Sequence, residues 1–259
     1  MNMKDVKAIT IPEGTVKKIE DANGNIIWGS QADFPYRRLE YIHFSGSEGC
    51  DVSVKPGSSG HQGVMIVTAS IETKGGTNYG VVIGCAGDST SSGAMRILCQ
   101  TYGNTVGQRV GRNSSTYGYS TTPVSGTIYR FRLRCSSNSS TYINIQNADG
   151  TNISGTDHTT SVSYTVNNMP NLQLMRYNSS GSIINNGYTV GNIYKFTKQQ
   201  TDSASAYLWK CYPVQRKSDG VCGLYNTVNG YFIPMQGTNI TDSAAGPVVD
   251  EYWDLTAPD

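Results

Sequence analysis

Residues 129–135 constrain the fold of this chain more than any other stretch. They read Tyr-Arg-Phe-Arg-Leu-Arg-Cys, so apolar and arginine side chains alternate without exception. Successive side chains of a β-strand point to opposite faces of its sheet. One face of this strand must therefore be core and the other must face water, as in antiparallel sheets that are covered on one side.

Strand patterns fill most of the chain between residues 35 and 235. Further strands are expected at residues 38–44, 63–71, 79–85, 94–99, 140–146, 162–166, 172–176 and 192–196. Residues 207–235 close the set, with one corner at residues 216–220 and a second turn at Asn229-Gly230. No window has a sustained period of about 3.6, and no repeat of roughly 20–50 residues occurs, so we expect few helices and neither a solenoid nor a propeller. The pattern predicts an all-β fold, an antiparallel jelly-roll sandwich of the concanavalin A-like kind.

Charge is sparse in this chain of 259 residues. Charged residues make up 15% of the sequence, against roughly 25% in an average protein, and the formal net charge is +1. We therefore expect no nucleic-acid partner and no membrane insertion, since nothing points to a basic face or an apolar span. No signal peptide is apparent, which predicts synthesis in a cytoplasm. The basic start and the acidic end leave two interpretations open, mutual attraction or simple solvation.

The first 28 residues form a pattern of their own. Runs at residues 6–11, 15–20 and 26–28 predict a three-stranded meander, whose second corner carries an Asn-Gly pair. So short a meander cannot bury enough apolar surface to be stable alone, so we expect it to dock on another surface. The residues expected to make that contact are Ile9, Ile11, Val16, Ile19, Ile27 and Trp28. The predicted organisation is a docking module at 1–28, a linker at 29–34, the sandwich at 35–236 and an acidic C-terminal tail at 237–259, outside the sheet.

Sequence motifs for catalysis are missing. A glycosidase on such a sandwich would need two carboxylates on one strand, roughly 5 Å apart in the retaining case, and no Glu-x-Asp or Glu-x-Glu spacing occurs. The histidines, at positions 43, 61 and 158, are scattered, and no P-loop, nucleophile elbow, zinc signature or dinucleotide fingerprint is present. The six cysteines include no CxxC pair, and we interpret them as small buried side chains, with disulfides as the alternative. These observations predict no catalytic residues, no cofactor and no metal.

A binding surface is the remaining possibility. Tyr102, Tyr117 and Tyr119 lie in a stretch rich in Gly, Asn and Ser at residues 101–122. Loops of this composition pair flat aromatic faces with short polar groups, as carbohydrate sites often do. The three tyrosines are therefore candidate ligand-binding residues, and the alternative is that they cover a sheet edge.

Two segments resemble a known module. Residues 35–42 (PYRRLEYI) and 212–226 (YPVQRKSDGVCGLYN) resemble the paired signatures of a laminin-G/concanavalin A-like jelly roll that is common in virion surface proteins of tailed phages and prophages of gut bacteria. Residues 16–28 are similar to a short segment that often precedes it. The resemblance implies two antiparallel sheets with the first and last strands adjacent, and a place on a fibre, tail or capsid surface.

The resemblance and the missing motifs together predict a non-enzymatic phage virion protein, a tail fibre, head fibre or capsid decoration protein at the virion surface. Its expected partners are other virion proteins and further copies of itself, as a homotrimer. One alternative is a receptor-binding tail protein that recognises host surface glycan. The other is a polysaccharide-degrading enzyme.

Overall fold

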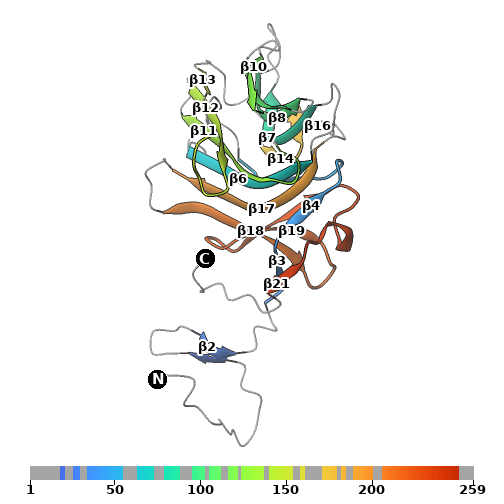
Figure 1. Cartoon of the computed structure of the whole chain (residues 1–259). Coiled ribbons are helices and arrows are strands. Elements are labelled where there is room, and N and C mark those ends of the chain that lie inside the picture. The colour runs from blue at the N-terminus through green and yellow to red at the C-terminus, as the bar shows by residue number, and fades with distance from the viewer. Residues whose placement is uncertain are drawn as a thin grey trace, which may run out of the picture.

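A computed structural model describes residues 18–20, 26–29, 34–54, 63–72, 79–87, 95–102, 105–111, 116–121, 124–136, 140–153, 158–160, 171–179, 182–184, 189–200 and 206–250 (Figure 1). The regular secondary structure of these residues consists of β-strands and one turn of 3-10 helix, η4 (Asp242–Ala244). None of the helical structure in these ranges is long and apolar enough to cross a membrane.

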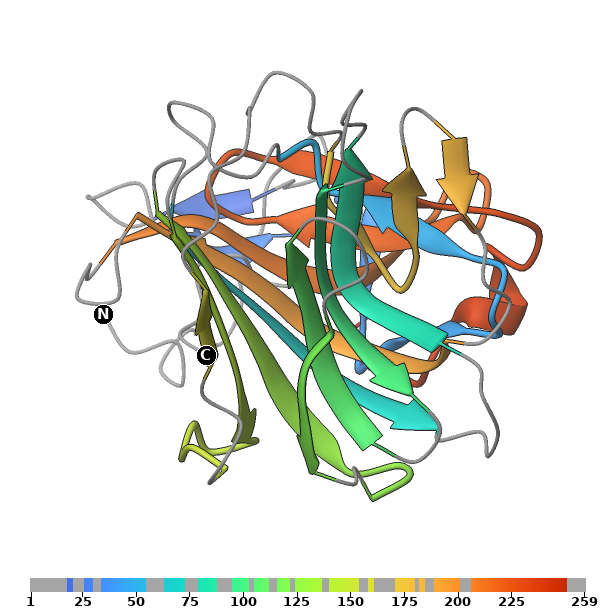
Figure 2. The same cartoon turned by 90° about the horizontal axis from the view of Figure 1, so that it is seen from above.

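Apart from β1 (Lys18–Glu20) and β2 (Ile26–Gly29), the strands form two sheets, which we call sheet I and sheet II. Sheet I follows the order β13 (His158–Thr160), β12 (Ser140–Asn147), β11 (Ile128–Ser136), β6 (Gly63–Glu72), β17 (Val190–Gln199), β18 (Tyr207–Arg216), β19 (Cys222–Asn226) and β20 (Tyr231–Gln236). Every pair in this series is antiparallel, and the long strands run side by side in the view from above (Figure 2).

Sheet II follows the order β10 (Thr116–Thr121), β9 (Thr105–Gly111), β8 (Met95–Tyr102), β7 (Tyr79–Gly87), β14 (Gln173–Leu174) and β5 (Gly49–Asp51). It also contains β15 (Tyr177–Ser179), which is parallel to β7, and β16 (Ser182–Ile184). Because β5 pairs with β20, the two sheets are joined at one edge. The predicted antiparallel jelly-roll sandwich is confirmed.

The core lies between the two sheets. Its largest fully buried side chains are Phe44, Phe131, Phe196, Leu39, Ile42, Met65, Ile71, Ile83, Leu133 and Leu172. The alternation at residues 129–135 has the expected result: Phe131 and Leu133 are buried, whereas Arg132 is half-buried and Arg134 is exposed on the other face of β11. Burial of these apolar side chains is the main stabilising contribution to the fold.

Two predicted strands differ from the observed ones. The strand expected at residues 38–44 is divided into β3 (Tyr36–Leu39), which pairs with β18, and β4 (Ile42–Phe44), which pairs with β17. The chain therefore changes its partner strand at Glu40 and Tyr41. Strand pairing is a long-range property, so the local alternation of side chains does not predict this change. The strand expected at residues 172–176 stops at Leu174 because Met175 has a φ of 60°, which turns the chain. The strand expected at 162–166 lies outside the described residues.

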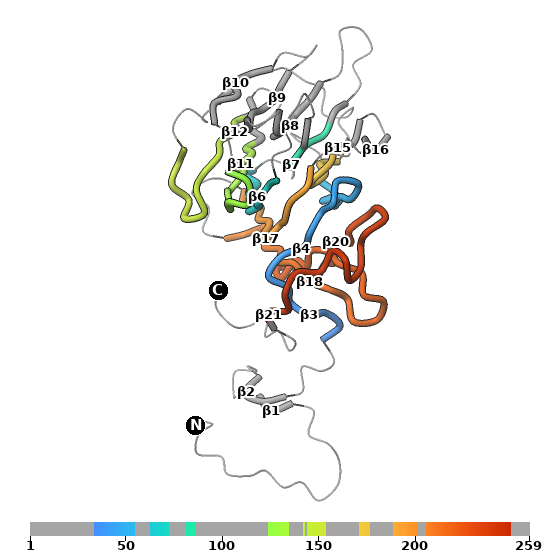
Figure 3. The backbone as a smooth tube through the Cα atoms, turned by 45° about the vertical axis from the view of Figure 1, so that its right-hand side comes forward, coloured from blue at the N-terminus to red at the C-terminus, as the bar shows by residue number. Residues whose placement is uncertain are grey.

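The two ends of the chain complete the fold differently. β1 (Lys18–Glu20) and β2 (Ile26–Gly29) pair as an antiparallel hairpin in a sheet of their own. Ile9, Ile11 and Val16 of the predicted docking module lie outside the described residues, so docking stays a prediction. At the C-terminus, β21 (Val248–Asp250) pairs with β3, beside the first strand of the sandwich (Figure 3). Residues 248–250 of the predicted tail therefore belong to the sheet.

Candidate functional site

The outer face of sheet I is built by the same alternation that builds the core. On β11, β17 and β18, buried Phe131, Phe196 and Cys211 point inward, so the neighbouring side chains point outward. The outward side chains include many cations and aromatic rings. We call the set Arg38, Arg132, Tyr142, Lys195, Lys210 and Tyr212 the basic–aromatic face.

Tyr212 lies at the centre of this face. The Arg38 guanidinium carbon lies 4.8 Å from the centre of its ring, the Lys195 Nζ 4.9 Å and the Lys210 Nζ 5.8 Å. Tyr212 itself is 5% exposed. Cations this close to an aromatic ring are attracted to its π-electrons, each by roughly 0.5–1 kcal/mol at an exposed site. The ring thereby holds three positive side chains from three strands close together, although like charges repel.

Arg132 extends the face along a row of paired residues. Arg132 is the strand partner of Ile66 on β6. Ile66 is in turn the partner of Thr197 on β17, and Thr197 is the partner of Lys210 on β18. Three strand spacings separate Arg132 from Lys210, so their backbones are about 14 Å apart. The Arg132 guanidinium lies 5.1 Å from the ring centre of Tyr142. Positive charge is therefore distributed over a surface four strands wide.

An aromatic cluster borders the face on β3, β19 and β20. Tyr36 lies at its centre, with ring centres 5.5 Å from Phe34, 5.0 Å from Tyr225 and 4.9 Å from Phe232. Burial raises the pKa of Tyr36, so its hydroxyl stays neutral. The Arg216 guanidinium lies 5.1 Å from the Phe232 ring. The cluster joins β3 to the β18–β19–β20 meander and supports the strands that carry Tyr212.

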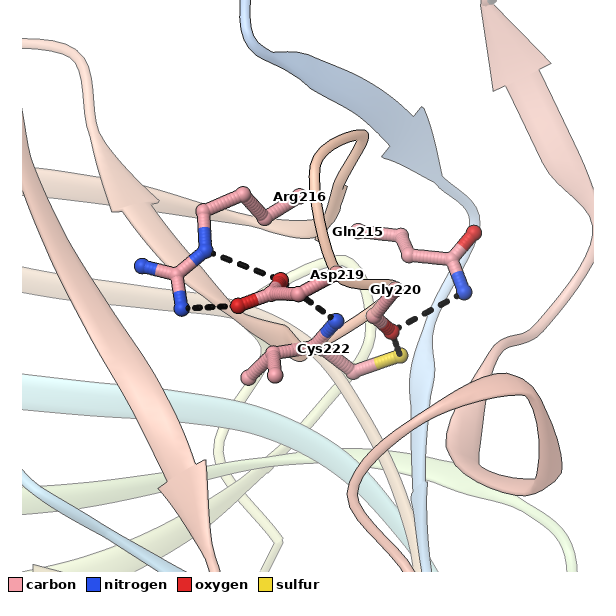
Figure 4. A network of polar contacts seen from close by, with 6 residues as sticks. Gln215, Arg216, Asp219, Gly220 and Cys222 are labelled. Carbon is pink, nitrogen blue, oxygen red and sulfur yellow. Dashed lines mark hydrogen bonds and ion pairs between the residues drawn. The ribbon is translucent and has the colours of Figure 1, made fainter.

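The corner at residues 216–220 is a structural element, as the sequence predicts. Arg216 donates from Nε to Asp219 Oδ1 at 3.0 Å and from Nη2 to Oδ2 at 2.6 Å, which lowers the pKa of Asp219 (Figure 4). Asp219 Oδ1 also accepts the backbone N–H of Val221, and Gln215 Nε2 donates to the carbonyl of Gly220. These bonds close the turn between β18 and β19.

The side chains of Glu48 and His43, two groups capable of acid–base chemistry, are hydrogen-bonded to other residues of the fold. Glu48 is buried and accepts hydrogen bonds from Ser45 and Ser47, so its carboxylate is committed to the fold. His43 Nδ1 lies 2.8 Å from the Asn192 side-chain oxygen across the β4–β17 pair. Within the described ranges, no group of three or more His, Cys, Asp or Glu side chains could hold a metal ion.

Tyr102, Tyr117 and Tyr119 lie on strands and not on the loops expected from their composition. Tyr102 ends β8, while Tyr117 and Tyr119 lie on β10, which follows β9 and β8 at the edge of sheet II. The backbone of Tyr117 and Tyr119 lies at the edge of sheet II, whereas Tyr102 is paired on both sides, with Tyr79 of β7 and Thr105 of β9. Their role in ligand binding stays a prediction.

Comparison with known proteins finds solved structures that are similar to this chain. No protein-family model and no curated protein matches it. The alginate lyase AlgAT5, from polysaccharide lyase family 7, is 14% identical with a TM-score of 0.36, and the match covers 61% of this chain and 62% of the lyase. Scytalido-glutamic peptidase is 14% identical with a TM-score of 0.29, over 80% and 92% of the two chains. SCP-B, a peptidase of the eqolisin family, is 11% identical with a TM-score of 0.24, over 82% and 90%.

These comparisons correct the functional prediction from the sequence. A non-enzymatic virion structural protein was expected, whereas the similar solved structures are a lyase and peptidases. The non-enzymatic part of that prediction relied on missing motifs. A missing carboxylate pair excludes one mechanism of glycoside cleavage, but it does not exclude enzymes as a class. The phage resemblance, the virion surface location and the homotrimer stay predictions, because no finding bears on them.

Sequence reasoning missed the basic–aromatic face. Its cations lie at positions 38, 132, 195 and 210, far apart in a chain whose net charge is +1. A net charge averages over all surfaces and says nothing about one face. The signal that was present is the arginine alternation on β11, which marks one strand of the face.

Proposed function

We propose that this protein binds an acidic polysaccharide on the basic–aromatic face. The observation that carries the proposal is the set of three cations, Arg38, Lys195 and Lys210, held around the ring of Tyr212. An extended polyanion can contact several such groups at once, and each contact adds to the affinity.

The shape of the face supports a polysaccharide ligand. Arg132 and Lys210 lie in one row across four strands, which suits an extended chain that crosses the sheet. Tyr142 offers an aromatic ring beside Arg132 in the same region. Duplex DNA is the competing polyanion, and the binding experiment below compares it directly with the acidic polysaccharides.

Binding can be tested by calorimetry with alginate and polygalacturonate, with neutral dextran as the control ligand. We expect the acidic polymers to bind, dextran not to bind, and the affinity to fall with added salt because the contacts are ionic. The double variant Arg132→Ala/Lys210→Ala should bind about tenfold more weakly, which corresponds to about 1.4 kcal/mol.

The matched control is Lys217→Ala, which removes a cation from the β18–β19 turn, outside the face as defined. This control should bind as the unaltered protein does. Equal binding by the double variant, or tighter binding of duplex DNA than of the acidic polymers, would overturn the proposal. New reducing ends in the same mixtures would show that the bound polysaccharide is also cleaved.

A further inference from the structure

A buried arginine between β14 and β15 of sheet II forms no ion pair with a carboxylate in the described part of the chain. Arg176 follows the turn at Met175 and is 6% exposed. Its side chain crosses Gly49 of β5 so closely that a methyl group at Gly49 would lie 2.3 Å from Arg176 Cδ. Cys50 and Leu174 point into the core, so the residues before them, Gly49 and Gln173, face the outer side of the sheet. The Arg176 side chain contacts both and therefore lies on that side.

Two neutral amides hold the guanidinium. Arg176 Nε donates to Gln173 Oε1 at 3.1 Å, and Nη2 donates to Gln236 Oε1. Among the described residues, no Asp or Glu oxygen lies within ion-pair distance of Arg176. The carboxylate of Asp51, on the neighbouring strand, instead accepts from the backbone N–H of Ser53 at 2.7 Å and from Asn171 Nδ2 at 3.4 Å.

The cluster also contains donors without acceptors. An arginine side chain has five N–H donors, and the two amide oxygens engage two of them. Gln173 Nε2 is fully buried and has no hydrogen-bond partner in the described part of the chain. Since Gln173 Oε1 accepts from Arg176, the orientation of this amide is determined and Nε2 remains the donor.

A buried cation and an unsatisfied buried donor are both unfavourable. Burial lowers the pKa of Arg176, which reflects the loss of water around its charge. Buried charges in proteins are normally paired, and a buried donor without an acceptor destabilises the fold. An anion bound beside Arg176 would remove both penalties.

We propose that Arg176 and Gln173 form a binding site for a small carboxylate group on the outer side of sheet II. Gln236 is exposed, and Asp51 and Asn171 are half-buried, so the cluster reaches the surface. The charge of Asp51 nearby disfavours a divalent anion such as phosphate, and a guanidinium matches the two oxygens of a carboxylate. The site lies on the other sheet from the basic–aromatic face and does not depend on it.

Thermal unfolding of the full chain tests the proposal, with sodium acetate compared with sodium chloride at equal ionic strength. Acetate should raise Tm by several degrees at concentrations far above its Kd, because a ligand of the native state stabilises it. Phosphate should raise Tm less. Glucuronate and N-acetylalanine, tested separately, show whether a sugar acid or a peptide-like carboxylate is preferred.

The decisive variant is Gln173→Glu, which keeps the shape of the side chain and supplies the missing negative charge. It should have a higher Tm than the unaltered protein in chloride and should lose the response to acetate. Arg176→Met should lose the response as well, and if it fails to fold, Gln173→Glu alone decides. Equal effects of acetate and chloride, or a full acetate response in Gln173→Glu, would show that the cluster holds only water.

Discussion

The backbone N–H of Asn239 donates a hydrogen bond of 3.4 Å to the carboxylate of Glu48, which lies 191 positions earlier in the chain. Glu48 also accepts from the backbone N–H of Ser45 at 2.8 Å and from the hydroxyls of Ser47 and Thr238. Glu48 as a whole is 1% exposed. It therefore joins the loop before β5 to the segment after β20, where the two sheets meet.

Replacement of this carboxylate should weaken the fold. Glu48→Gln should lower the free energy of unfolding at pH 7 by about 1–3 kcal/mol, since hydrogen bonds to a charged acceptor are stronger than those to an amide. Urea denaturation followed by circular dichroism measures this change. Glu72→Gln, at the exposed end of β6, is the matched control and should leave stability nearly unchanged. Equal losses in the two variants would contradict the role assigned to Glu48.

The same carboxylate predicts a specific dependence of stability on pH. Burial by itself would raise the pKa of Glu48, but hydrogen bonds from Ser45 and Ser47 outweigh it and lower the pKa from 4.5 to about 2. A lowered pKa means that the stability from the ionised group is complete above pH 4.5 and is lost as the pH falls toward 2. The difference in stability between the unaltered protein and Glu48→Gln should therefore shrink across this interval.

A glycine on β17 permits close packing against β6. A methyl group on Gly191 would lie 2.2 Å from the carbonyl oxygen of Ser70, so Gly191→Ala must displace backbone. We expect Gly191→Ala to lower the free energy of unfolding by about 3 kcal/mol or more, which denaturation curves measure. Gly126→Ala is the comparison, because Gly126 has a φ of 78° but no atom within 4 Å of the added carbon. Gly126→Ala should lower the free energy of unfolding by about 1 kcal/mol, because backbone strain is its only effect.

Buried thiols should be chemically inert in the folded protein. Cys50, Cys85, Cys211 and Cys222 are buried and carry thiol groups. Burial raises the pKa of Cys50 and of Cys222 to about 12, so almost no thiolate exists at pH 8. Iodoacetamide at pH 8, followed by peptide mass mapping, should label these four positions only after unfolding in urea. Rapid labelling of Cys50 without denaturant would contradict the packing of the core.

Two substitutions of Asp219 distinguish its ion pair with Arg216 from its hydrogen bond to the backbone of Val221. Asp219→Asn removes the charge but keeps an oxygen for the backbone N–H of Val221, whereas Asp219→Ala removes both. Tm should fall further in Asp219→Ala than in Asp219→Asn, and added salt should narrow the difference between Asp219→Asn and the unaltered protein. Identical Tm values for the two variants would show that the bond to Val221 contributes nothing.

Much of the fold could be predicted from local pattern. The alternation at residues 129–135 identified β11 with its core and solvent faces, because the side-chain period of a strand is a local property. The turns at residues 216–220 and at Asn229-Gly230 were equally predictable, since turn residues act through their own φ and ψ. The all-β class and the closing strands β18, β19 and β20 follow from such signals.

Only the tertiary structure decided which strands are neighbours, and both candidate sites depend on that choice. The basic–aromatic face gathers Arg38, Arg132 and Lys210 from strands far apart in the sequence, and Arg176 meets Gln236 60 positions later. The division of β3 from β4 and the return of β21 to β3 are choices of the same kind. Local periodicity fixes which way a side chain points, whereas long-range pairing and register fix what it meets.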